Sequence, residues 1–501
     1  MFKQNKYAQA FVGFVVLAGQ VDAFWRLPCS SPVVVERADP IMDPNVVSKH
    51  VHTIMGSNAF NFTMDYSDAQ SATCSTCKAV EDLSSYWVPS LYYHAENGSL
   101  ISVTQGGGGA LIYYLQRSDP NDPNAAEGLI PFPKDFRMIA GNQDNRNYTD
   151  TLEQRAVSFV CLGTEGPATY ELPNRNCPGG LRAQLTMPAC WDGKNLDSPD
   201  HKSHMAYPSG LDNGPCPASH PKRFITIFYE VTWSVDDFKD MWYGDKQPFV
   251  FSHGDPTGYG YHGDFLNGWD IPTLQKAINE CNAASGNIEE CGAFTLRNDD
   301  DMKACKVLPR VNETVSGVLE SLPGCNAVQA GPEPAIQQPS QFTVPLPLTP
   351  SRIFSLDDNT DSRCKIDCTD VAEIGDPILP FTDMSKQMGW KYVACAQDPA
   401  GQSRTLSDFS LDQPDMTVEK CISTCSDKGF EYAGVEYTSQ CFCGHDLPQD
   451  RLPANGTQGD CSMPCAGNSN QFCGGAARVS VYTKCPDISQ CLNDDDGSMK
   501  L

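Results

Sequence analysis

The sequence predicts a mostly β protein, with a large β-sandwich-like N-terminal domain containing few helices, a proline-rich linker and a small disulfide-rich α+β module. Three observations support this prediction. Residues 24–325 hold many short apolar runs broken by Gly, Pro, Asn and Asp, with few helical periods. Residues 331–350 contain six prolines and one charged residue, Glu333. Eight cysteines then fall within residues 395–473.

The N-terminus is typical of a secretory signal peptide over residues 1–23. Two lysines precede the apolar run AFVGFVVLAG, and Val21-Asp22-Ala23 offers a small-x-small cleavage site, which predicts a mature start at Phe24. The run is about half of the ~20 apolar residues that a membrane span needs. The predicted tail, residues 484–501, is polar. We therefore expect an extracellular, secreted protein with no membrane span in the mature chain.

Composition agrees with secretion. The 23 cysteines predict disulfides, and the same context assigns Cys74 and Cys77 to disulfides rather than to zinc. The formal net charge of −26 disfavours nucleic acid and anionic lipid as partners. Five Asn-x-Ser/Thr sequons mark candidate glycosylation sites, at Asn61, Asn97, Asn147, Asn312 and Asn455.

Periodicity predicts the main elements of the large domain. Residues 100–117 resemble two strands joined by the four glycines at 106–109. Residues 224–235 alternate apolar residues onto one face, as a strand does. Residues 270–285 give the clearest helix, with an apolar stripe of Leu274, Ala277, Ile278 and Cys281.

After the linker, residues 326–387, the module at 388–483 is predicted to rely on disulfides rather than on its core. Thr417 suits a helix N-cap, and Cys421 and Cys425 then share one helix face. The eight cysteines predicted to form its disulfides are Cys395, Cys421, Cys425, Cys441, Cys443, Cys461, Cys465 and Cys473.

The cysteine order, the CxC pair and the segments "CAGN" and "CGG" of this module resemble a WSC domain, the fungal cell-wall-sensor module. The resemblance implies carbohydrate binding, with a cell-wall polysaccharide of the glucan, chitin or xylan class as partner. Trp390, Tyr437 and Phe442 are candidate sugar-stacking residues, although each ring could instead belong to the core of a small domain.

Clustered His and acidic residues mark the candidate site of the large domain. His50 and His52 stand two apart, which places both imidazoles on one face of a strand, and His204 is the third candidate metal ligand. The stretch "SHGDPTGYGYHGDF" repeats His-Gly-Asp, and its second copy, His262 and Asp264, is the favoured catalytic pair. Further candidate catalytic carboxylates are Asp200 and Glu230. A convergent cluster would suit a divalent metal cofactor or general acid–base catalysis; the alternative is a set of tight turns.

Motifs of this domain, among them "FWRLPCSS", "SKHVHTIMGSNAF", "SHMAYPS" and "DPTGYGYHGDFLNGWD", resemble a secreted fungal domain of unknown function. The resemblance spans about residues 37–280 and implies no activity, cofactor or catalytic residue.

Three functions stay open from the sequence. The first is a carbohydrate-active enzyme, such as a glycoside hydrolase, that the WSC module holds on a wall polysaccharide. The second is a non-catalytic, glycan-binding adhesive wall protein. The third is a metal-dependent oxidative enzyme that uses His50, His52 and a third histidine.

Overall fold

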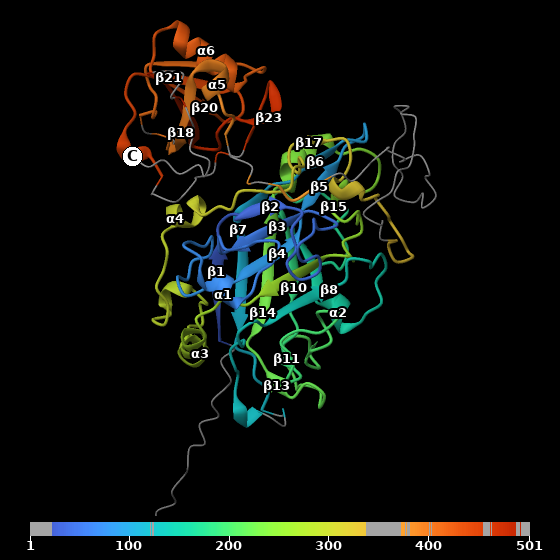
Figure 1. The fold of residues 1–501 in the computed structure, drawn as a ribbon. Helices are drawn as coiled ribbons and strands as arrows, with labels where there is room; N and C mark the ends of the chain where they lie inside the picture. Colours follow the sequence, from blue (N-terminus) through green and yellow to red (C-terminus); the bar gives the residue numbers. More distant parts are fainter. Residues whose placement is uncertain are drawn as a thin grey trace, which may run out of the picture.

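The computed structural model describes residues 23–336, 372–377, 381–453 and 461–491, with short gaps at 121, 123–124, 376, 400, 402, 462 and 487–490 (Figure 1). The predicted signal peptide up to residue 22, the linker segment 337–371 and residues 492–501 of the predicted tail lie outside the described residues.

Two five-stranded antiparallel sheets pack face to face and form the core of the large domain (Figure 1). At their interface the Tyr86 ring lies 5.9 Å from that of Tyr229, and the Tyr86 hydroxyl lies 2.7 Å from the Tyr114 hydroxyl. The first sheet has the order β1 (Phe24–Cys29), β7 (Gln105–Leu115), β14 (Thr226–Trp233), β10 (Leu181–Thr186) and β9 (Val157–Cys161). The second has the order β2 (Val34–Glu36), β3 (His52–Gly56), β4 (Ser85–Pro89), β16 (His262–Leu266) and β8 (Arg137–Gly141). The predicted sandwich-like, mostly β class is confirmed.

Smaller elements surround the sandwich. A four-stranded sheet has the order β15 (Phe249–Phe251), β5 (Leu91–His94), β6 (Leu100–Ser102) and β17 (Val318–Leu319), and a three-stranded one has the order β12 (Met205–Ala206), β11 (Cys190–Trp191) and β13 (Lys222–Arg223). The α-helices are short: α1 (Tyr66–Gln70), α2 (Leu152–Arg155), α3 (Ile271–Glu280) and α4 (Asp299–Ala304). The 3₁₀ helices of this domain are η1 (Ala125–Glu127), η2 (Val235–Met241), η3 (Ile288–Glu290) and η4 (Pro323–Cys325).

The two clearest predicted elements are present. β14 occupies the middle of the predicted strand, and the alternating residues from Ile225 to Val235 are buried. α3 begins after Asp270, whose side chain accepts a hydrogen bond from the Thr273 amide, and the helix buries Leu274 and Ile278. Each of these two elements buries one apolar face, as the periodicity of its residues predicted.

The predicted hairpin around the four glycines is wrong. All four lie inside β7, whereas β6 belongs to another sheet, and residues 103–104 connect the two strands. At Gly109 the backbone has φ +87°, and a Cβ would lie 2.5 Å from the Cys29 carbonyl oxygen. Glycine is needed there for the close approach of β1, and this need has no signature in the local sequence.

The C-terminal module is a five-stranded sheet with one covering helix. The strand order is β18 (Trp390–Gln397), β24 (Arg478–Lys484), β20 (Tyr432–Glu436), β21 (Gln440–Gly444) and β19 (Phe409–Asp412), and the remaining elements are α5 (Ser385–Met388), α6 (Val418–Asp427), η5 (Gln449–Arg451), β22 (Pro464–Cys465) and β23 (Asn468–Phe472). Thr417 caps α6 by accepting from the Lys420 amide, as predicted.

Disulfides staple both parts of the chain. The eight predicted cysteines of the module pair as Cys395–Cys461, Cys421–Cys441, Cys425–Cys443 and Cys465–Cys473. In the large domain the bonds Cys29–Cys77 and Cys74–Cys305 account for the CxxC pair, so zinc does not hold it. Among the described residues, no helix has the length and apolar character that a membrane crossing requires.

Candidate functional site

Strand register brings two of the predicted clusters together. On β4, Pro89 pairs with His52 of β3, and Trp87 pairs with Asp264 of β16. Positions two apart on a strand share a face, so His52, His262 and Asp264 stand on the same face of the second sheet. This face is turned away from the first sheet, because Trp87 packs in a separate cluster from the sandwich core.

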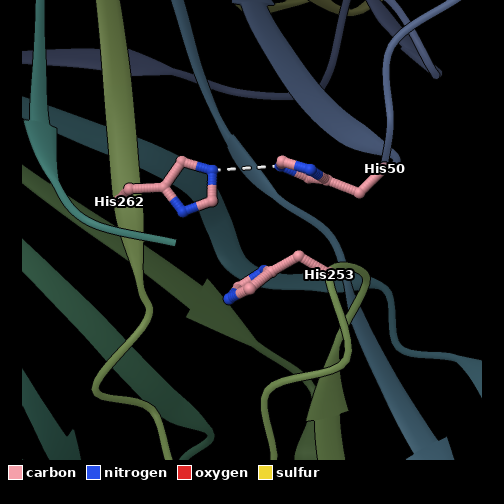
Figure 2. Close-up of side chains that lie close together, drawn as sticks. All are labelled: His50, His253 and His262. Atoms are coloured by element: carbon pink, nitrogen blue, oxygen red, sulfur yellow. Dashed lines mark hydrogen bonds between the residues drawn. The ribbon is translucent and has the colours of Figure 1, made fainter. Parts of the chain in front are cut away.

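Four imidazoles and one carboxylate meet on that face. His50 precedes β3, His253 follows β15, and His52, His262 and Asp264 are as placed above; we call these five residues the histidine cluster. All are buried, with exposures of 5% or less. Figure 2 shows His50, His253 and His262 converging, and the Nε2 atoms of His50 and His262 are 3.0 Å apart. Ring centroids in this trio are separated by 5.0–5.4 Å.

Many polar atoms of the histidine cluster have no hydrogen-bond partner. They are Nδ1 of His50, Nε2 of His52, both ring nitrogens of His253 and both carboxylate oxygens of Asp264. A buried polar group without a partner costs about 1–3 kcal/mol, so natural folds rarely collect several in one place. Such a concentration indicates a site rather than a packing accident.

Burial keeps the cluster uncharged. It lowers the pKa of His52 to about 4 and of His262 to about 3, and it also lowers the pKa values of His50 and His253. Burial, reinforced by the nearby Asp39, raises the pKa of Asp264 well above its usual range. Neutral imidazoles can bind a metal or accept a proton, but charged ones can do neither.

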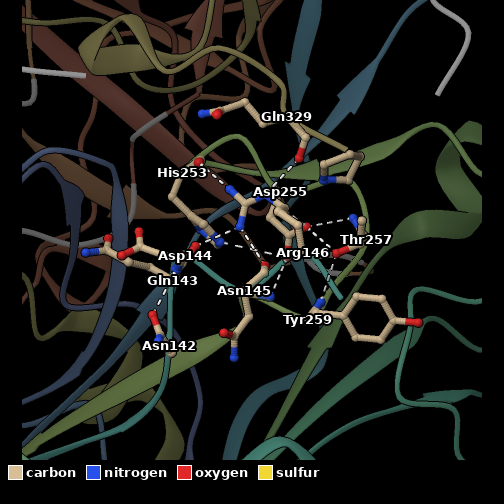
Figure 3. Close-up of polar contacts among 12 residues, drawn as sticks. Asn142, Gln143, Asp144, Asn145, Arg146, His253, Asp255, Thr257, Tyr259 and Gln329 are labelled. Atoms are coloured by element: carbon tan, nitrogen blue, oxygen red, sulfur yellow. Dashed lines mark hydrogen bonds and ion pairs between the residues drawn. The ribbon is translucent and has the colours of Figure 1, made fainter. Parts of the chain in front are cut away.

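A buried arginine fixes the loop that carries His253. Arg146 donates to the carbonyls of His253 (3.2 Å) and Gln329 (2.7 Å), and its Nε lies 3.7 Å from Asp255 (Figure 3). Asp255 in turn accepts from the amides of Thr257 and Gly260, both at 2.7 Å. Asp255 of the first His-Gly-Asp triplet therefore holds the loop in place, whereas His253 of the same triplet enters the cluster.

The remaining predicted site residues of the large domain lie elsewhere. His204 Nε2 donates to the Arg137 carbonyl (2.8 Å) and its Nδ1 is hydrogen-bonded to the Ser198 hydroxyl (2.8 Å), and so it does not join His50 and His52. Asp200 is exposed and accepts hydrogen bonds from Ser198 and Ser203 within its own turn. Partial burial raises the pKa of Asp200, but these hydrogen bonds outweigh it, so the pKa lies below its usual range.

Glu230 lies on the first sheet and is held by neighbours on its own sheet. It accepts from Gln184 (3.0 Å) and Tyr113 (2.9 Å), and Arg182 lies 3.3 Å away. His262 and Asp264 are buried, so a polysaccharide cannot contact them in this structure. The four candidate catalytic residues do not form one exposed cleft among the described residues.

Sequence reasoning missed one residue of the site and ranked another too low. His253 lies in the repeated His-Gly-Asp stretch, but the second triplet was favoured over the first. Arg146 was not singled out, and "NQDNRNY" contains no pattern that marks a buried arginine.

In the module, a pocket of about 400 Å³ opens beside β19 and β21. Its polar lining is Ser403, Arg404, Ser407, Ser410, Asp412 and Gln440, and its apolar lining is Leu406, Leu411 and Phe442. The Arg404 guanidinium lies over the Phe442 ring at 4.7 Å and is also held by Asp398 and Glu436. Mixed polar and apolar lining of this kind suits a small organic ligand.

The three candidate sugar-stacking residues take different positions. Phe442 lines the pocket but is only 7% exposed and belongs to one core cluster of the module, and Trp390, 2% exposed, belongs to the other. Tyr437 is 53% exposed at the turn between β20 and β21, close in sequence to the pocket residue Gln440. Of the sequons, Asn61, Asn97, Asn147 and Asn312 are exposed, and Asn455 lies outside the described residues.

Comparison with known proteins supports both resemblances. Residues 39–269 match the family DUF1996, a domain of unknown function, and residues 392–475 match the WSC domain. Two proteins of Arthroderma benhamiae named "WSC domain-containing protein" are 40% and 39% identical over 96 and 98 residues, and human Kremen protein 2 is 40% identical over 94. These matches span 18–19% of this chain and 10%, 13% and 19% of the three relatives.

Proposed function

Because the chain carries a DUF1996 domain followed by a WSC domain, we propose that it is a secreted, cell-wall-associated protein whose module binds a polysaccharide of the glucan, chitin or xylan class. The observation that carries this proposal is the pocket beside β19 and β21. It combines side chains that can bond sugar hydroxyls with an aromatic ring and a planar guanidinium.

The pocket and the overall charge together favour a neutral glycan. Asp412 adds a carboxylate to the pocket rim, and the chain carries a net charge of −26, so an anionic polymer would be repelled. Tyr437 offers an exposed ring at the turn between β20 and β21, which suits a longer glycan chain that extends beyond the pocket.

The binding test uses the full secreted chain on insoluble glucan, chitin and xylan. Removing two hydrogen-bonding groups, in the double variant Asp412→Ala/Gln440→Ala, is expected to weaken binding about tenfold, since each bond contributes about 0.5–1.5 kcal/mol. Asp427→Ala is the control, because it removes the same charge from an exposed position on α6, outside the pocket lining. Binding to none of the three polymers, or equal binding by the double variant, would refute the proposal.

The same incubations test the enzymatic alternative. Soluble oligosaccharides detected by mass spectrometry would identify a carbohydrate-active enzyme. Retention on the polymer without release would identify the adhesive, non-catalytic protein.

A further inference from the structure

The ring nitrogens of the histidine cluster are oriented like those of metal ligands. His52 Nδ1 lies 3.1 Å from the Ala38 carbonyl, and His262 Nδ1 lies 2.8 Å from the Gly260 carbonyl. A carbonyl can only accept, so each Nδ1 carries the proton and each Nε2 keeps its lone pair in the neutral ring; that of His52 has no partner, and that of His262 faces His50 Nε2 at 3.0 Å. A backbone carbonyl on the far nitrogen is the usual second contact of a metal-binding histidine.

The spacing of three rings fits one ion. His50, His253 and His262 each offer a nitrogen within 4.8 Å of the others. At a metal–nitrogen distance of about 2.05 Å, ring centroids sit about 3.2 Å from the ion, so two rings on a tetrahedral ion have centroids about 5.2 Å apart. The observed separations are 5.0, 5.0 and 5.4 Å.

A second triad overlaps the first. His52, His262 and Asp264 also place ligand atoms within 4.8 Å of one another. His262 belongs to both triads but has one free nitrogen, so only one triad can hold an ion through it at a time. The first triad fits better, because the His52 ring lies 4.3 Å from that of His50 and 6.1 Å from that of His262.

We propose that the DUF1996 domain binds one divalent first-row transition metal ion through His50, His253 and His262, with His52 and Asp264 lying beside the site. Imidazole-rich sites favour zinc or copper, whereas calcium and magnesium prefer oxygen ligands throughout. The site is closed to solvent, as structural metal sites are. The ion then ties the loop at 252–260 to the segment before β3 and does not act on the glycan.

The metal content of the full secreted chain tests this proposal. We expect about one equivalent of zinc or copper per chain by mass spectrometry of the purified protein, or after a chelator-treated sample is incubated with Zn²⁺. Zn²⁺ should also raise the unfolding temperature of the treated sample. Co²⁺ loading provides a readout without any variant, because nitrogen coordination gives visible absorption bands.

Variants locate the ion. His50→Gln and His253→Gln are expected to lower the metal content at least tenfold, while His220→Gln, a histidine bonded to Ser203 outside the cluster, retains it. A folded wild type without metal after incubation with Zn²⁺, Cu²⁺ or Co²⁺ would overturn the proposal, and so would full metal content in the two cluster variants. Glycan binding is measured separately through the module pocket, so either proposal can fail alone.

Discussion

Replacing Arg146 with alanine tests whether the loop around His253 is held by a buried clamp. The Arg146 and Asp255 side chains are both 0% exposed, and the guanidinium also donates to the carbonyls of Gln143 (2.7 Å), Asn145 (2.8 Å), His253 and Gln329. Removing one partner of a buried ion pair costs about 3–5 kcal/mol, because the other charge stays buried. We therefore expect Arg146→Ala to lower the free energy of unfolding by about 3–5 kcal/mol.

Calorimetry of the full chain measures the effect. At roughly 2 °C per kcal/mol for a domain of this size, the large-domain transition should fall by about 6–10 °C. Arg146→Lys should lie between wild type and Arg146→Ala, since it keeps the charge but loses the planar fork. Arg155→Ala is the control, because its pair with Asp150 is exposed and should leave the transition unchanged. A loss below about 1 kcal/mol for Arg146→Ala would refute the clamp.

Two further predictions concern a glycine and a carboxylate. At Gly254 a Cβ would lie 2.1 Å from the Ala327 carbonyl oxygen, whereas Gly98 has a similar positive φ but open space around it. Gly254→Ala should therefore destabilise the chain more than Gly98→Ala, as measured by calorimetry, and equal losses of stability would contradict this. Burial, with Asp398 beside it, raises the pKa of Glu436 to about 8, so the native state holds a proton that the unfolded chain loses above pH 4.5. The contribution of Glu436 to the free energy of unfolding should be complete below pH 4.5 and lost as the pH rises through 8. The free energy of unfolding of the wild type should therefore fall between pH 5 and 9, and Glu436→Gln should reduce this fall. An equal fall in the variant would exclude Glu436 as its source.

The sequence predicted those parts of the fold that depend on a local period. β14 and α3 each bury one face, and the alternation or stripe of their residues records it. The cysteine spacing likewise predicted that disulfides hold the module together. The hairpin prediction failed at the glycines of β7 because Gly109 permits the close approach of β1, a strand that lies far away in sequence.

The histidine cluster was only partly predictable for a related reason. The spacing of His50 and His52 and the repeated triplet mark two candidate segments, but their meeting depends on β4 lying between β3 and β16. His204 has the same residue type in a similarly acidic context, and only the fold shows that it bonds to Ser198 and the Arg137 carbonyl instead. Sheet order is a non-local property, so spacing along the chain could not separate these cases.

The burial of the cluster also constrains the enzymatic alternative. A glycoside hydrolase needs two carboxylates across an accessible sugar, roughly 5–10 Å apart. Asp264 is 1% exposed, and Glu230, 8% exposed, is already bonded on the other sheet. A sugar could therefore reach Asp264 only if the segments that bury it moved. Hydrolysis through Asp264 requires such a movement, whereas a structural metal site requires Arg146→Ala, which loosens the loop that carries His253, to lose metal and stability together.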